Sequence, residues 1–133
     1  MRPAGTLTIK RKRDWLRNKM HEVSIAQSLL EIAVENCKNT GSKRIEAIKV
    51  KVGRASGIMP DALLFAFDAV KIGTIADKAI LNIEEVPVSG FCESCKKNFT
   101  VDEAFVVSCP LCGNIALRID TGHELHIEEM DVF

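Results

Sequence analysis

Four of the five cysteines occur as two Cys-x-x-Cys pairs, Cys92/Cys95 and Cys109/Cys112. The 13 residues between the pairs are slightly fewer than the roughly 15–20 that are usual for a four-cysteine zinc site, but they are enough for a tight hairpin. Two residues between paired cysteines let a short turn aim both thiolates at one tetrahedral ion. Gly113, directly after the second pair, lets the backbone fold back so that N–H groups can reach sulfur. The sequence therefore predicts a zinc ion bound by Cys92, Cys95, Cys109 and Cys112.

The predicted zinc site is structural rather than catalytic. Four thiolates complete the tetrahedral coordination of Zn²⁺, whereas a catalytic site keeps a position for water or substrate. Residues 91–117 contain few regularly spaced apolar side chains. Metal binding, worth roughly 10–16 kcal/mol in small zinc peptides, can offset the entropy lost when such a segment is ordered. An iron–sulfur cluster and a redox-active dithiol are the alternatives for the same four cysteines.

Met20-His21-Glu22 directly precedes the first predicted helix and is a second group that could bind metal. Backbone nitrogens just ahead of a helix are free of intrahelical bonds. Ni²⁺ favours planar nitrogen coordination, for which an imidazole with nearby amine or deprotonated amide nitrogens is a suitable donor set. His21 could supply the imidazole, although spacing alone favours a plain solvated histidine beside Glu22.

Hydrophobic periodicity predicts the helices that would position these groups. Apolar residues at three- and four-residue spacing predict a first helix whose inward face is Ala26, Leu29, Leu30, Ala33, Val34 and Cys37. Ser24 with Gln27 resembles a capping box at its start, and Gly41 suits its end. A second helix is predicted to open at Pro60 and to end before Gly73, with an inward face of Leu63, Leu64, Phe67 and Val70.

Three segments alternate apolar and polar side chains as strands do, at residues 44–52, 79–88 and 124–132. The inward residues of the first and last segments are Ile48, Val50, Val52, Leu125 and Ile127. Because the last segment follows the cysteines, we expect the chain to return there and pair with the earlier strands. These patterns predict an α+β fold, in which two helices pack against a small mixed sheet that carries a Cys₄ zinc-ribbon-like insert.

Charge divides the chain at Met20. Residues 1–19 carry seven Lys or Arg against one Asp and show no sustained period, so we interpret them as a flexible basic arm. The chain has no net charge, so residues 20–133 carry a net charge of −6, which argues against binding of nucleic-acid phosphates by the folded part. Neither a membrane-spanning apolar run nor a secretory signal is present, which leads us to expect a cytoplasmic protein with no membrane partner.

The remaining candidate residues carry weaker signals. Cys37 lies on the apolar face of the first helix, where a small core residue is expected. His123 and His126 flank the last strand and are not expected to bind metal. The sequence has no catalytic Ser/His/Asp group, phosphate-binding glycine loop or paired carboxylates, so we expect no enzyme activity. A zinc-ribbon protein that binds nucleic acid or assists transcription is the alternative function.

The motifs together resemble those of the HypA/HybF family of nickel metallochaperones. The resemblance rests on Met20-His21-Glu22 with the following Val23-Ser24-Ile25-Ala26, the paired cysteines, and the closing Gly122-His123-Glu124-Leu125. Val52-Gly53 and Pro60-Asp61-Ala62-Leu63 extend it across essentially all of residues 20–133. Residues 1–19 remain unmatched.

The resemblance implies that His21 binds nickel, that Glu22 supports it and that the four paired cysteines hold zinc. It implies a nickel-binding α/β domain of residues 20–88 and 118–133, with a zinc-binding insert of residues 89–117. Family members pass nickel to a HypB-like GTPase and then to the hydrogenase large-subunit precursor, and in some bacteria they also serve urease maturation. Both a monomer and a homodimer are compatible with these features.

One departure concerns the position of Met20, because family members normally begin at the Met-His-Glu motif with a free α-amine that can join the nickel site. Here Met20 is internal, so an amide replaces the amine and we expect weaker nickel binding. The abrupt change in charge and periodicity at Met20 favours a further hypothesis. In this hypothesis Met20 is the true start, and residues 1–19 are a misassigned start or an expression remnant.

Overall fold

The computed structural model describes residues 21–133, and of His21 it describes only the backbone. The elements in chain order are α2 (His21–Asn39), β1 (Ile45–Gly53), the 3₁₀ turn η1 (Arg54–Ser56), α3 (Pro60–Val70), β2 (Ile80–Val86), β3 (Val88–Cys92), β4 (Lys97–Val101), β5 (Leu117–Thr121) and β6 (Leu125–Val132). The chain forms two compact units, which are described separately. Unit 1 comprises residues 21–51, Met59–Glu84 and Leu125–Phe133, and unit 2 comprises Val52–Ile58 and Glu85–Glu124. These two units are defined by their compactness and do not report where metals bind. The bounds given above for the nickel-binding domain and the zinc-binding insert therefore stay a prediction.

Helix α2 buries the face that its periodicity predicts. Val34 is half-buried, and the other five residues of that face are buried, as are Ile25 and Ile32 beside them. The helix ends in a Schellman motif, in which Ser42 N–H donates to the Cys37 carbonyl at 3.1 Å and Gly41 N–H donates to the Lys38 carbonyl at 3.0 Å. The predicted end at Gly41 is therefore confirmed.

The predicted start of this helix is wrong. Ser24 lies inside α2 rather than at its cap, because helical backbone already includes His21 and Glu22. Ile25, directly after Ser24, is only 1% exposed and packs in the core beside Ala26 of the predicted face. The Glu22 carboxylate in the first turn adds a favourable interaction with the helix dipole.

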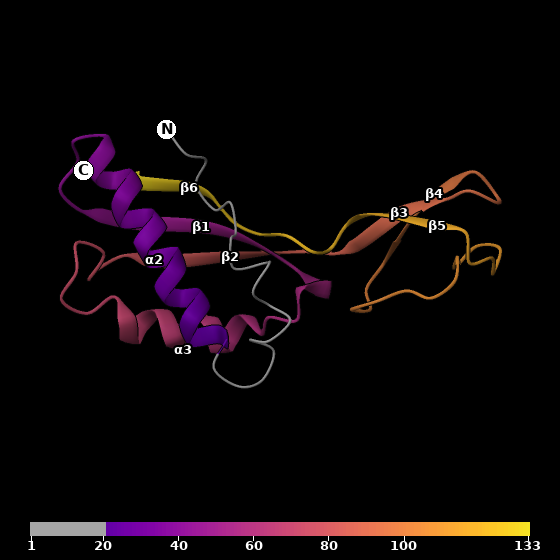
Figure 1. Ribbon diagram of the computed structural model, residues 1–133, viewed down its shortest axis with the longest axis horizontal. Coiled ribbons are helices and arrows are strands. Elements are labelled where there is room, and N and C mark those ends of the chain that lie inside the picture. The colour runs from indigo at the N-terminus through magenta and orange to yellow at the C-terminus, as the bar shows by residue number, and fades with distance from the viewer. Residues whose placement is uncertain (1–20) are drawn as a thin grey trace. The chain divides into compact units, whose positions relative to one another are not determined.

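Helix α3 begins at Pro60, whose fixed φ suits the first position of a helix and whose missing N–H has no intrahelical partner there. Leu63 and Phe67 are buried as predicted, while Leu64 and Val70 are half-buried. In unit 1, α3 packs against α2, and α2 packs against β6 (Figure 1).

The sheet of unit 1 has the strand order β2-β1-β6, so the last strand returns to pair with β1 as predicted (Figure 1). Inward residues of β1 and β6 are buried, and the opposite face carries charge. Lys49 Nζ lies 3.3 Å from carboxylate oxygens of both Glu84 on β2 and Glu128 on β6, and Lys51 Nζ lies 3.3 Å from Glu128. The α+β prediction of two helices against a small sheet is confirmed.

Unit 2 contains a second three-stranded sheet in the order β4-β3-β5, with both pairings antiparallel. The sequence predicted one strand through residues 79–88, but the structure has β2 ending at Val86 and β3 starting at Val88. Pro87 explains the break, because proline has no N–H to donate to a strand ladder. Strand β4, with Phe99 as its buried residue, was not predicted.

Candidate metal sites

The first cysteine pair lies on a tight turn between β3 and β4. Cys92 ends β3, and its carbonyl accepts a 2.8 Å hydrogen bond from the N–H of Lys96. Lys96 has a φ of 60°, the left-handed conformation that L-residues with side chains rarely adopt. This reversal brings Cys95 back toward Cys92 and leads the chain directly into β4.

The second pair adopts the same turn with a different residue at the reversal. Gly113 has a φ of 82°, and its N–H donates to the Cys109 carbonyl at 2.8 Å. The N–H of Cys109 in turn donates to the Asn114 carbonyl at 2.7 Å. The fold-back predicted at Gly113 is therefore present. The left-handed position is therefore taken by Lys96 in the first turn and by Gly113 in the second.

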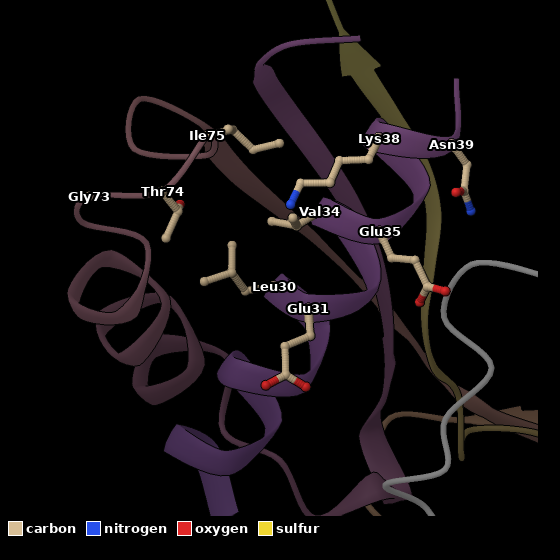
Figure 2. Close-up of a pocket in the computed structure, with 9 residues that line it drawn as sticks. All are labelled: Leu30, Glu31, Val34, Glu35, Lys38, Asn39, Gly73, Thr74 and Ile75. Carbon is tan, nitrogen blue, oxygen red and sulfur yellow. The ribbon is translucent and has the colours of Figure 1, made fainter. Parts of the chain in front are cut away.

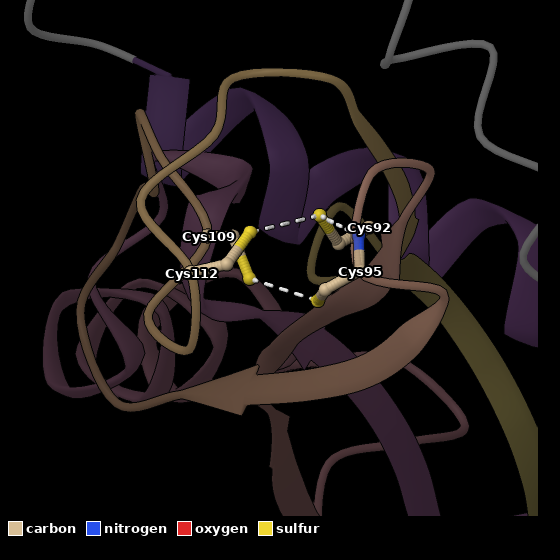
Figure 3. Close-up of side chains that lie close together, drawn as sticks. All are labelled: Cys92, Cys95, Cys109 and Cys112. Atoms are coloured by element: carbon tan, nitrogen blue, oxygen red, sulfur yellow. Dashed lines mark hydrogen bonds between the residues drawn. The ribbon is translucent and has the colours of Figure 1, made fainter.

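The two turns face one another and bring the four sulfurs together (Figure 3). All four Sγ atoms lie within 4.8 Å of one another, with Cys92–Cys112 at 3.6 Å and Cys95–Cys109 at 3.8 Å. Tetrahedral zinc with Zn–S bonds of about 2.3 Å requires sulfurs about 3.8 Å apart. A disulfide would require about 2.05 Å, and all four cysteines are free. The donor set and its spacing fit a Cys₄ zinc ion.

Backbone N–H groups stabilise the first cysteine of each pair. Cys95 N–H donates to Cys92 Sγ at 3.5 Å, and Leu111 N–H donates to Cys109 Sγ at 3.3 Å. Both acceptors are buried, whereas Cys95 is half-buried and Cys112 is exposed. The four sulfurs therefore converge on one point but differ in their access to solvent.

The sulfurs also perturb one another's protonation. Burial, followed by hydrogen bonds to the neighbouring sulfurs, raises the pKa of Cys95 to about 12. Burial would raise the pKa of Cys109 too, but N–H groups of Leu111 and Cys112 outweigh it and lower that pKa to about 7. Four adjacent thiolates disfavour one another without a cation. A divalent metal ion removes this conflict by binding all four as thiolates.

The predicted nickel motif lies at the start of α2, in unit 1. The Glu22 Oε2 atom accepts a hydrogen bond from the N–H of Met59 at 3.4 Å, and Met59 directly precedes α3. The Glu22 carboxylate therefore links the starts of the two helices. Residues 1–19, Met20 and the side chain of His21 lie outside the described residues, so the nickel ligand assignment stays a prediction.

Two motif residues that carried the family resemblance prove to be structural within unit 2. A Cβ atom on Gly53 would lie 2.1 Å from the carbonyl oxygen of Gly122, so the two backbones touch. Gly53 N–H donates to the Glu124 carbonyl at 2.7 Å, and Gly122 N–H donates to Glu124 Oε1 at 2.9 Å. Sequence reasoning missed this contact. The glycine in each motif was its only signal.

Cys37 is fully buried, as predicted for a core residue, and its thiol lies 3.7 Å from the Arg44 carbonyl. Burial raises the pKa of Cys37, which keeps the thiol protonated. His123 is exposed and His126 half-buried, and within the described residues the cluster of four cysteines includes neither histidine.

A groove of about 660 Å³ lies in unit 1 between α2 and residues 73–75 (Figure 2). Leu30, Val34 and Ile75 supply its apolar surface, and Glu31, Glu35 and Lys38 supply its charged groups. Among the described residues that line it there is no cysteine or histidine.

Neither helix of the described chain combines the length and hydrophobicity that crossing a bilayer requires.

The family model described as "Hydrogenase/urease nickel incorporation, metallochaperone, hypA" matches residues 20–132. A protein of Geobacter metallireducens named hydrogenase maturation factor HypA is 41% identical over 113 residues, which are 85% of this chain and 99% of the relative. Its namesake from Rhizobium leguminosarum bv. viciae is 38% identical over 113 residues, with the same coverage.

Solved structures agree with the fold. The solution structure of the nickel metallochaperone HypA from Helicobacter pylori aligns with a TM-score of 0.60 at 23% identity, over 84% of this chain and 96% of that one. A second structure, titled a solution structure of HypA protein, gives a TM-score of 0.65 at 24% identity, over 87% of this chain and 98% of that one. At these identities the likeness supports the fold alone.

Proposed function

Because the chain belongs to the HypA family, we propose that it is a nickel metallochaperone that binds Ni²⁺ through Met20-His21-Glu22 and delivers it for maturation of nickel–iron hydrogenase. The observation that carries the proposal is the family match, which starts at Met20 and includes this motif together with the four clustered cysteines. A carrier of this kind binds and releases its cargo without transforming it. We therefore propose no enzyme activity.

The four cysteines are proposed to hold a structural zinc ion. Sulfur separations of 3.6 and 3.8 Å support this, since they are close to the tetrahedral requirement. The closed Cys₄ set leaves no position for cargo or substrate, so zinc would serve only to fold the segment around it. Zinc is the proposed resident metal, in an insert of residues 89–117. Nickel is the proposed transported cargo, bound by a domain of residues 20–88 and 118–133.

The nickel donors are proposed to be the His21 imidazole and nearby backbone nitrogens. This set suits the planar nitrogen coordination that Ni²⁺ favours. Glu22 supports the site through the hydrogen bond from Met59, which fixes the start of α2 against the start of α3.

The partners follow from the family and remain proposals. A HypB-like GTPase would receive the nickel and pass it to the hydrogenase large-subunit precursor, and urease maturation proteins are proposed as a second destination. The acidic charge of residues 20–133 supports protein partners over nucleic acid. A cytoplasmic protein, acting as monomer or homodimer, is consistent with this role.

The decisive experiment combines metal analysis with nickel titration of wild type, His21→Ala and His123→Ala. His123 is exposed and provides a matched histidine control. We expect one zinc per chain in all three proteins, with nickel binding at least about tenfold weaker in His21→Ala alone, because only that variant loses the proposed imidazole ligand. Undiminished nickel binding in His21→Ala would exclude His21 as the ligand.

The same titration is applied to a form that begins at Met20. This form presents a free α-amine, whose pKa of about 8 makes it a better donor at neutral pH than an amide that must first lose its proton. Tighter nickel binding is expected. Equal or weaker binding would show that the amine takes no part in the site.

A further inference from the structure

We propose that Cys112 is the oxidation-sensitive ligand of the zinc site, and that a hydroperoxide opens the site there by forming a Cys92–Cys112 disulfide. The inference rests on the zinc part of the proposed function. It adds a defined point of chemical attack and a defined product. In the proposed zinc site itself, each of the four cysteines would supply one thiolate.

Solvent access separates Cys112 from the other three sulfurs. Cys92 is 0% and Cys109 3% exposed, Cys95 is half-buried, and Cys112 is exposed. Oxidation of cysteine follows the exposure and the thiolate character of the sulfur. Zinc keeps all four as thiolates, so exposure decides which of them a soluble oxidant meets first.

Backbone hydrogen bonds reinforce this difference. Within the described residues, the N–H···Sγ bonds end on the first cysteine of each pair, from Cys95 to Cys92 and from Leu111 to Cys109. An N–H donor stabilises the thiolate, and a more stable thiolate is a weaker nucleophile. Cys112 combines exposure with the absence, in this part of the chain, of such a donor.

Distance identifies the second sulfur of the disulfide. Cys92 Sγ lies 3.6 Å from Cys112 Sγ, so the pair must close by about 1.5 Å to reach the disulfide length (Figure 3). The other close pair, Cys95 and Cys109, is 3.8 Å apart and contains no exposed sulfur. Cys92 is therefore positioned to attack once Cys112 is oxidised.

The chemistry is a two-electron oxidation by hydrogen peroxide. The Cys112 thiolate attacks one peroxide oxygen, the O–O bond breaks, and sulfenic acid and hydroxide form. The Cys92 thiolate then attacks the Cys112 sulfur, the S–O bond breaks, and hydroxide leaves as the S–S bond forms. Two thiolates are oxidised and the peroxide is reduced to two hydroxide ions, which are protonated to water. Only Cys95 and Cys109 remain as zinc ligands.

Zinc-loaded full-length Cys37→Ala protein provides the test, because this variant lacks the fifth thiol without altering the cluster. The protein is treated with graded hydrogen peroxide, released zinc is followed with a chromogenic chelator, and disulfides are mapped by peptide mass after free thiols are blocked. We expect zinc release to rise in step with the Cys92–Cys112 disulfide. In untreated protein, N-ethylmaleimide should modify Cys112 at least about tenfold faster than Cys92 or Cys109.

Two variants sharpen the test. Cys112→Ser should slow peroxide-induced zinc release at least about tenfold, whereas Cys95→Ser should retain the Cys92–Cys112 disulfide. If Cys112→Ser does not fold, the disulfide map of the Cys37→Ala protein decides alone. A Cys95–Cys109 disulfide, or equal modification of all four thiols, would overturn this inference but would not contradict the proposal that the four cysteines bind zinc. Protein that contains no zinc before oxidation would overturn both.

Discussion

Replacing Gly53 with alanine tests whether the close contact between the Gly53 and Gly122 backbones holds unit 2 together. Gly53 has φ −74° and ψ 145°, an extended conformation that any residue adopts, so alanine causes no backbone strain of its own. The added Cβ would nevertheless lie 2.1 Å from the Gly122 carbonyl oxygen and 2.6 Å from the His123 nitrogen. Even a close C–H···O contact needs about 3.3 Å. The two segments must therefore separate by about 1 Å.

That separation removes hydrogen bonds as well as packing. The bonds from Gly53 N–H to the Glu124 carbonyl and from Ala55 N–H to the Gly122 carbonyl are both 2.7 Å long. Lengthening by about 1 Å takes each beyond the range of an effective hydrogen bond. Two lost bonds at about 0.5–1.5 kcal/mol each, with an overpacking cost of about 1–3 kcal/mol, give a loss of about 2–6 kcal/mol in the free energy of unfolding.

Urea denaturation of the zinc-loaded protein measures this loss, with circular dichroism and zinc release as parallel signals. Gly57→Ala is the matched control, because Gly57 has a φ of 83° and a Cβ there would meet no described atom within 4 Å. Its cost should come from backbone conformation alone, about 1–2 kcal/mol. The reasoning is refuted if Gly53→Ala lies within about 1 kcal/mol of wild type, or is less destabilised than Gly57→Ala.

Three further substitutions test the two cysteine turns and the charged sheet face. Lys96→Gly should stabilise the zinc-loaded protein by about 0.5–1 kcal/mol in urea denaturation, because glycine relieves the left-handed φ of 60°. Gly113→Ala should instead destabilise it, and a destabilised Lys96→Gly protein would contradict this account. The hydrogen bond from Lys51, reinforced by Lys49, lowers the pKa of Glu128 below its ordinary 4.5 in the folded protein. The free energy of unfolding that this interaction adds is therefore present above pH 4.5 and is lost as the pH falls through the pKa of Glu128 in the folded protein. Glu128→Gln should flatten that decline in a pH series of urea midpoints, and an unchanged profile would count against the interaction.

The cysteine cluster was predictable because its chemistry depends on local spacing. Two residues between paired cysteines set each turn, and a hairpin between the pairs suffices to bring the turns together. The buried faces of α2 and β1 were predictable for a similar reason, since periodicity reports which side of an element meets the core. The break between β2 and β3 was also predictable from Pro87, because proline has no N–H for a strand ladder, but the prediction of a single strand through residues 79–88 did not take this into account.

The contacts that were missed involve residues far apart in the chain. Gly53 and Gly122 meet only when distant segments are aligned, and neither sequence motif specifies its partner. The hydrogen bond between Glu22 and Met59 likewise joins the starts of two helices. Lys96 was missed for another reason, because turn rules favour glycine or asparagine at a left-handed position and give lysine no weight.

The strand order β2-β1-β6 also constrains how the protein folds during synthesis. Strand β6 lies after the whole cysteine-containing segment, so the sheet of unit 1 stays one strand short until the ribosome has translated past Glu124. All the strands of unit 2 precede that point. Until β6 pairs with it, β1 has a free edge, and an unpaired strand edge is prone to aggregation. A chain that lacked β6 would keep that edge of β1 exposed, so the last strand protects the sheet against aggregation as well as completing its core.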